Sequence, residues 1–186
     1  MSINSRSGAA KVGSLATVAA LAVGSLGVTG PAHADTVGVS DARGDMGHKA
    51  DIWRVRVVNE KLVRVVVKHD NLTRRGTKGA SVFVDTIRRK PGPEFVFLAG
   101  IFDGSDYQLV RMANWKRKGG PLSCQIDLKL RYRTDVSHFK MRRGCLGHPG
   151  RVRVAVKVSA ERAQPGRWAT DWLTGRRDFT RWVARG

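Results

Sequence analysis

Basic residues alternate with apolar ones along several segments of this 186-residue chain. Where the alternation has a period of two, one side of a β-strand is apolar and the other side carries Arg or Lys. Strands of this kind that are neighbours in one sheet would form a cationic face, and an anionic partner would relieve its internal repulsion. Arg predominates, and its planar guanidinium suits bidentate contacts with phosphate or carboxylate groups. We predict that the anion-binding residues are Arg54, Arg56, Arg64, Lys68, Lys129, Arg131, Arg133, Arg151 and Arg153.

A second interpretation of the same charge needs no partner. The chain has 34 Lys and Arg against 15 Asp and Glu, a net charge of +19, and such residues keep a protein in solution even when they are spread over every face. No signature of a nucleic-acid-binding fold accompanies them. We therefore expect an anionic extracellular polymer or glycan as the partner, and not genomic nucleic acid.

Carboxylates form the next group that could do chemistry. Asp41 and Asp45 lie on either side of Gly44, Asp51 opens the first predicted strand, and Asp103 lies in a predicted turn. Carboxylate oxygens at loop positions can wrap a calcium ion, although the spacing is not that of an EF-hand. The alternative is ordinary turn and cap chemistry, together with salt bridges to the many Arg residues.

Tryptophans are the third group. Trp115, Trp168, Trp172 and Trp182 all lie in predicted loops or in the C-terminal tail. Such rings can serve as stacking platforms for sugars, or they can close the open end of a small β-sandwich, where their burial stabilises the fold. The second role is the more common one for a Trp near a chain terminus.

Catalytic motifs are scarce. His48, His69, His138 and His148 are scattered, without a metal-ligand spacing such as H-E-x-x-H. The sequence around Ser105 is not the G-x-S-x-G turn of a nucleophile elbow. We expect a protein that is not an enzyme, with an unrecognised extracellular hydrolase or an enzyme inhibitor as the alternative.

Short strands must position all of these side chains. Residues 51–59 and 62–69 read as a β-hairpin that points Trp53, Val55 and Val57 inward. Residues 160–186 read as a tail that lies over the rest and could end in a strand. Turn-bounded strands at this spacing predict an all-β fold, an antiparallel β-sandwich with a jelly roll as its main variant. The further predicted strands are 81–86, 94–98, 107–112, 122–133, 137–141 and 151–159.

The first 34 residues read as a cleavable signal peptide. Arg6 and Lys11 precede an apolar run over 12–28, and Ala32-His33-Ala34 is an A-x-A cleavage site. The alternative is a retained anchor, but the run is shorter than the ~20 residues that span a bilayer. Cleavage leaves 35–186, a usual length for one domain. We expect a secreted, soluble monomer without a transmembrane segment, either released or associated with the cell wall.

Cys124 and Cys145 are the only cysteines. In an exported protein such an even pair is normally oxidised. A cross-link between them would contribute about 3 kcal/mol by the chain-entropy model. A metal site would need further ligands at conventional spacing, and none are nearby. We therefore predict a disulfide near the edge of the hairpin formed by 122–133 and 137–141.

Several short motifs resemble those of small secreted actinobacterial proteins of unassigned function. The motifs are Asp41-x-x-Gly44-Asp45, Asp85-Thr86, Gly92-Pro93-Glu94-Phe95, Cys145-Leu146-Gly147-x-Pro149-Gly150 and Phe179-Thr180-x-Trp182-Val183. More distantly, the chain is similar to extracellular β-sandwich domains that bind carbohydrate or haem. In some of these domains N-terminal aspartates hold a structural calcium, which implies Asp41, Asp45 and Asp85 as the ligands here. The family's haem-ligating Met/His pair has no counterpart in this chain. We therefore expect no cofactor, with a structural calcium ion as the alternative.

Taken together, the residues predict a secreted, non-catalytic binding module of the cell envelope that holds an anionic polymer on a basic strand face. The alternative in the binding class is a carbohydrate-binding β-sandwich with a structural calcium.

Overall fold

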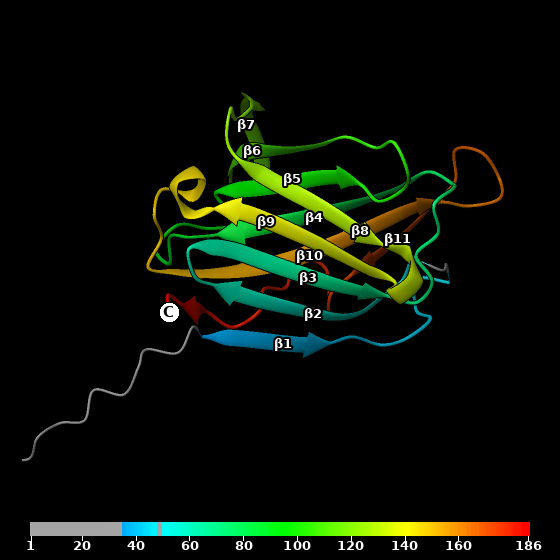
Figure 1. The fold of residues 1–186 in the computed structure, drawn as a ribbon, viewed down its shortest axis with the longest axis horizontal. Coiled ribbons are helices and arrows are strands. Elements are labelled where there is room, and N and C mark those ends of the chain that lie inside the picture. Colours follow the sequence, from blue (N-terminus) through cyan, green and yellow to red (C-terminus); the bar gives the residue numbers. More distant parts are fainter. Residues whose placement is uncertain (1–34, 48–49) are drawn as a thin grey trace, which may run out of the picture. The chain divides into compact units, whose positions relative to one another are not determined.

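The computed structural model describes residues 35–47 and 50–186. The predicted signal peptide and His48 lie outside these residues. Two antiparallel sheets pack face to face (Figure 1), as the alternating pattern predicted, and the all-β sandwich is confirmed. In this view the five-stranded sheet lies in front of the seven-stranded one. No helix among the described residues is long and apolar enough to cross a membrane.

The five-stranded sheet contains the predicted hairpin. Asn59 and Leu62 bracket its turn, and every neighbouring pair of strands runs antiparallel. The strand order is β1 (Thr36–Ser40), β2 (Ile52–Asn59), β3 (Leu62–His69), β9 (Val136–Arg142) and β8 (Ile126–Arg131).

The seven-stranded sheet is built around the valine-rich strand β10. Its order is β11 (Trp168–Trp172), β10 (Arg151–Glu161), β4 (Lys78–Asp85), β5 (Phe95–Gly100), β6 (Tyr107–Ala113) and β7 (Lys116–Pro121), with β12 (Val183–Ala184) paired to β10. Two 3-10 turns, η1 (Tyr132–Thr134) and η2 (Arg143–Leu146), precede and follow β9.

The core lies between the sheets and follows from the period of two. Val63, Val65 and Val67 of β3 are fully buried, as are Val152, Val154, Val156 and Val158 of β10. β-branched side chains suit this half-buried pleated surface. The residues between them face outward, which is how the fold places the basic side chains of β3 on the surface.

Trp53 does not point into this core, contrary to the prediction. The pairing of β2 with β3 shifts between Ile52 and Arg54, so Trp53 sits in a β-bulge. Its half-buried ring lies under the Arg43 guanidinium at 3.4 Å, with Lys68 5.6 Å away. The bulge lets both Ile52 and Val55 be buried, which strict alternation would forbid.

The long strand predicted over 122–133 is shorter in the structure. Only Ile126–Arg131 forms β8, because residues 122–125 carry the chain from the seven-stranded sheet to the five-stranded one. Leu122 still donates its backbone N–H to Leu109 of β6. The alternation in this segment predicts an inward-facing set of side chains, and these do pack against the core, half-buried at the sheet edge. They are Leu122, Cys124, Ile126, Leu128, Leu130 and Tyr132.

The disulfide between Cys124 and Cys145 is confirmed, with 5.9 Å between the two Cα atoms. It joins the segment that crosses between the sheets to η2, beside the hairpin of β8 and β9. The disulfide therefore links two irregular segments that are not paired with each other as β-strands.

The C-terminal tail adds two strands to β10, one of them at its end, as the sequence suggested. Strand β7 was missed, because Lys116–Pro121 is entirely exposed and reads as a loop. Its hairpin with β6 turns through Asn114 and Trp115, both with positive φ, which matches a two-residue I′ turn.

Candidate functional site

The outer side of the five-stranded sheet carries a basic face, defined here as Arg54, Arg56, Arg64, Lys68, Lys129, Arg131 and Lys140. Cross-strand pairing brings these side chains together: Arg54 pairs with Lys68, and Arg64 with Lys140. Arg54 lies flat over β1, where a Cβ added at Gly38 would stand 3.2 Å from Arg54 Nη2. Six of the nine predicted anion-binding residues therefore share one face, and Arg133 follows in η1 at its margin.

Ion pairs neutralise part of the basic face. Arg64 pairs with Glu60, Lys68 Nζ lies 3.2 Å from Asp135 Oδ2, and Lys140 Nζ lies 2.8 Å from Asp127 Oδ2. Within residues 35–47 and 50–186 no carboxylate pairs with the four remaining members. These unpaired cations are Arg54, Arg56, Lys129 and Arg131.

His138 lies in the middle of the basic face, where burial and the positive charges around it lower its pKa. It pairs across the ladder with Lys129 on one side and Val66 on the other. Partial burial lowers the pKa of His138, and the positive charges of Arg131, Lys140, Lys129 and Arg56 lower it further. Four cations therefore lie close enough to this imidazole to disfavour its protonation.

Arg151 and Arg153 lie elsewhere. Both are on β10 in the other sheet, where Arg153 binds the buried Asp85 with Nε at 2.8 Å and Nη2 at 2.7 Å from Oδ2. The same guanidinium lies over the rings of Phe179 and Trp182. The sequence could not assign strands to sheets, so the prediction that these two residues belong to the basic face is corrected by the strand order.

An acidic cluster forms where the N-terminal segment meets β11. Asp45, Asp51 and Asp171 each offer a carboxylate oxygen within 4.8 Å of the others. Asp51 accepts the backbone N–H groups of Gly44 and Met46, and Asp171 accepts that of Ile52. Hard oxygen ligands of this kind could hold a calcium ion. The sequence indicated Asp45 and Asp51 among the loop carboxylates, although the resemblance implied only Asp45 of this cluster as a ligand. It missed Asp171, since only the pairing of β11 with β10 brings Asp171 here.

The other two residues proposed as calcium ligands are placed differently. Asp41 Oδ1 accepts the backbone N–H groups of Ala42 and Thr174, at the edge of the acidic cluster. Asp85 is not part of the cluster, because it is fully buried at the end of β4 and paired with Arg153.

Calcium removal tests the predicted cation site. If Asp45, Asp51 and Asp171 bind calcium, we expect excess calcium to raise the melting temperature of residues 35–186 above its value in chelator, because a ligand that binds only the folded state stabilises it. Asp171→Asn should abolish that increase, and Asp70→Asn, an exposed control, should preserve it. An identical melting temperature of the wild type with calcium and with chelator would refute the site.

Two buried groups make stability depend on pH in opposite directions. Burial lowers the pKa of His69 from 6.5 to about 4, so only the unfolded chain binds this proton between those values, and stability falls as pH drops. Burial raises the pKa of Asp171 from 3.8 to about 6, reinforced by neighbouring carboxylates. The folded chain then binds the extra proton, and stability rises as pH drops. Each effect is about 3 kcal/mol at most, so they largely offset.

Asp171→Asn should separate the two effects. In chelator we expect this variant to melt several degrees above the wild type at pH ~7. As pH falls toward ~4.5 it should lose more stability than the wild type, because the destabilising effect of His69 is no longer opposed by that of Asp171. Thermal melts across this range check it, with Asp70→Asn as the control. Parallel pH profiles of wild type and Asp171→Asn would contradict the assignment.

The outer side of the seven-stranded sheet is apolar at its centre. Val96, Val110 and Met112 are buried there against Phe83 and Leu98. Trp115 covers this side, with its ring 5.0 Å from Phe83, 6.1 Å from Trp172 and 5.2 Å from Phe179. Trp115 and Trp172 thus pack against the sheet, and Trp182 lies against the Arg153 guanidinium. Among the described tryptophans, Trp168, which is 51% exposed, is the one that could stack on a ligand.

A groove of about 720 Å³ lies beside Trp168 on the same side. Its floor is formed by small residues of β4 and β10, among them Gly79, Ser81 and Ser159. Lys157, Arg117, Asp106 and Gln108 supply polar walls. An exposed indole over a floor of small residues is a shape that a sugar ring can occupy. Of this groove the sequence indicated only Trp168, because the residues of its floor become neighbours only through the pairing of β4 with β10.

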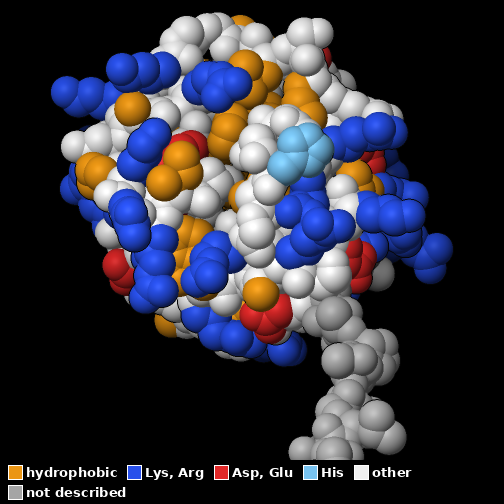
Figure 2. Space-filling view, turned by 90° about the vertical axis from the view of Figure 1, so that its left-hand side faces the viewer, with side chains coloured by type: hydrophobic (Ala, Val, Ile, Leu, Met, Phe, Trp, Pro, Cys, Tyr) orange, Lys and Arg blue, Asp and Glu red, His pale blue; other side chains and the backbone are white. Residues whose placement is uncertain are grey.

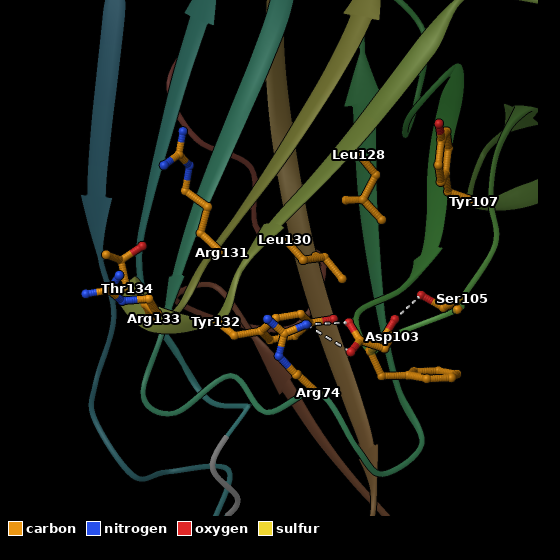
Figure 3. A pocket seen from close by; sticks show the side chains of 12 residues that line it. Arg74, Asp103, Ser105, Tyr107, Leu128, Leu130, Arg131, Tyr132, Arg133 and Thr134 are labelled. Carbon is orange, nitrogen blue, oxygen red and sulfur yellow. Dashed lines mark hydrogen bonds and ion pairs between the residues drawn. The ribbon is translucent and has the colours of Figure 1, made fainter.

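A cleft of about 660 Å³ opens between β8 and β6, and it shares Tyr107 with the groove beside Trp168. Figure 3 shows Leu128 and Leu130 pointing toward Tyr107, while Arg131 and Arg133 point away from the cleft. Arg74 Nη1 binds both oxygens of Asp103 at 3.3 and 3.0 Å. Burial and the nearby Asp103 raise the pKa of Tyr132 to about 12. Arg74 and Asp103 are thus paired with each other at this end of the cleft.

Comparisons with known proteins identify no relative: no family model, no curated protein and no solved structure matches this chain.

Proposed function

We propose that this protein is a secreted, non-catalytic binding module of the cell envelope that holds an anionic polymer on its basic face. One observation carries the proposal: Arg56, Lys129 and Arg131 surround His138 on the outer side of one sheet, with Arg54 on the same face, and none of these four cations has a carboxylate partner among the described residues. Such a surface is repulsive by itself, and a polyanion relieves that repulsion while it releases its own counterions.

The open outer side of a sheet favours an extended polymer over a small molecule, because binding pockets for small molecules are concave and mostly apolar. Guanidinium groups spaced along neighbouring strands can meet successive phosphate or carboxylate groups of a chain. The disulfide and the predicted signal peptide support a location outside the cell. Teichoic-type wall polymers and acidic polysaccharides have the required charge.

Salt dependence tests this function. Residues 35–186 should bind a polyphosphate probe with an affinity that falls steeply and log-linearly with salt concentration. Binding to a neutral polysaccharide should be absent. Salt-independent binding to the neutral polysaccharide, without affinity for polyphosphate, would refute the proposal.

That opposite result would support the second candidate, neutral-glycan binding in the groove beside Trp168. The specific observation in its favour is the half-exposed indole at the edge of a floor of small residues. Stacking on a ring is only weakly affected by salt, so the two candidates separate in one titration.

A further inference from the structure

A hollow of about 690 Å³ lies at the end of the sandwich that carries η2 and the β2–β3 turn, at left in Figure 1. Of the residues that the structure describes, four Lys or Arg residues and one His line it, and no Asp or Glu does. Figure 2 looks at this end of the molecule and shows Lys and Arg side chains over much of it, with few Asp or Glu. The basic lining consists of Lys61, Arg111, Arg142, Arg143 and His148.

The fold brings these cations together from separate parts of the chain. Lys61 belongs to the β2–β3 turn, and Arg142 ends β9 opposite Leu62, so both stand at the end of the five-stranded sheet. Arg111 comes from β6 of the other sheet, opposite Phe95. The hollow therefore lies where the two sheets meet, and no single strand pattern could have revealed it.

Arg143 is a buried member of this basic lining. The residue is only 8% exposed, and its guanidinium donates to the carbonyl oxygen of Pro149. No carboxylate pairs with it in the part of the chain that the structure describes, and its Nε has no hydrogen-bond partner there. Burial and the nearby Arg185 lower the pKa of Arg143. A buried cation without a counter-charge is costly, and an anion in the adjoining hollow would offset that cost.

Rigid segments hold the basic lining in place. The disulfide ties the segment with Leu122 and Ser123 to η2, so two segments that line the hollow are covalently joined. His148 is held at φ 55°, and its ring lies close to Gly144, where an added Cβ would stand 3.4 Å from Nε2. A site built on such supports loses little conformational freedom when a ligand binds.

We propose that this hollow is a binding site for a phosphoryl oxyanion, a phosphate or diphosphate group. Tetrahedral oxyanions match convergent guanidinium and ammonium donors, which can each meet a different oxygen. The volume exceeds that of one phosphate, which leaves room for a diphosphate or an esterified phosphate. The site stands apart from the basic face, since neither Lys61, Arg111, Arg143 nor His148 belongs to it.

Isothermal titration with diphosphate at constant ionic strength tests the proposal. The test variant is Lys61→Gln/Arg111→Gln, whose two side chains are exposed and belong to neither the core nor the basic face. Arg162→Gln/Arg167→Gln removes the same charge from the exposed β10–β11 loop and is the matched control. We expect the control to bind like the wild type and the test variant to bind at least about tenfold more weakly, because each lost contact is a charge-assisted hydrogen bond. Equal affinities of the two variants, or no binding by the wild type, would overturn the proposal.

The histidine resonances locate the bound anion. Diphosphate should shift the ring signals of His148 and leave those of His138 unchanged, since His138 lies on the basic face. A shift of His138 alone would assign the binding to the basic face and overturn the proposal, while the polymer-binding function would stand. Acetate at the same ionic strength should compete poorly, and sulfate should compete better, because the site selects tetrahedral oxyanions and not charge alone.

Discussion

Replacing Arg56, Lys129 and Arg131 with Gln is expected to lower the affinity for an anionic polymer roughly 50-fold near physiological salt and to reduce the log–log salt slope by about 2. Each lost contact with a flexible polyanion removes roughly 0.7 from that slope, as for a single-stranded nucleic acid. These three side chains surround His138 and have no carboxylate partners among the described residues. Their removal should also relieve repulsion, so the melting temperature should not fall.

Charge alone could produce a smaller effect, and a matched control measures it. Arg162→Gln/Arg167→Gln/Arg176→Gln removes the same net charge from exposed positions outside the basic face. We expect this control to keep most of the affinity. Equal losses in the two triple variants, measured by salt titration on polyphosphate, would show that net charge and not the arrangement on the sheet determines binding.

Trp115→Ala is expected to lower the free energy of unfolding by about 3 kcal/mol, the largest effect of any single substitution outside the central core that we predict. Its ring contacts Phe83, Trp172 and Phe179 and covers the apolar outer side of the seven-stranded sheet. It also packs against the backbone at Gly92, where an added Cβ would stand 2.9 Å from Trp115 Cδ1. Ala would leave this apolar surface open to water. Urea denaturation measures the change.

Trp168→Ala is the matched control, because Trp168 is 51% exposed and lies on the same side of the same sheet. Its effect on stability should be within about 0.5 kcal/mol. If the groove binds a neutral glycan, this substitution should abolish that binding while the fold remains intact. Similar stabilities of the Trp115 and Trp168 variants would contradict the assignment of Trp115 as a structural cover.

Most of the fold could be predicted from local patterns. The valine alternation in 62–69 and 151–159 dictates strands with one buried face, and the turn at 59–62 dictates a hairpin. Trp53 was misplaced because a bulge leaves no mark on the alternation. Strand β7 was missed because its charged residues, Gly and Pro bury no apolar surface. Only its backbone pairing with β6 makes it part of the sheet.

The sites were less predictable, because they depend on which strands are neighbours. Alternation correctly indicated that Arg56 and Lys129 face outward, but it indicated the same for Arg153, which belongs to the other sheet. Asp171 joins Asp45 and Asp51 only through the pairing of β11, and Arg111 reaches the hollow near Arg143 only because the sheets meet there. Pairings between residues far apart in sequence carry this information, and a single sequence does not show them.

Co-sedimentation with purified bacterial cell wall tests the central claim most directly. Residues 35–186 would be mixed with intact wall and with wall stripped of its anionic polymers, each at low and at high salt. Binding to intact wall at low salt that is lost both on stripping and at high salt is the result that an anionic partner on the basic face predicts. Binding that persists on stripped wall at high salt would contradict that claim and would point to the groove beside Trp168.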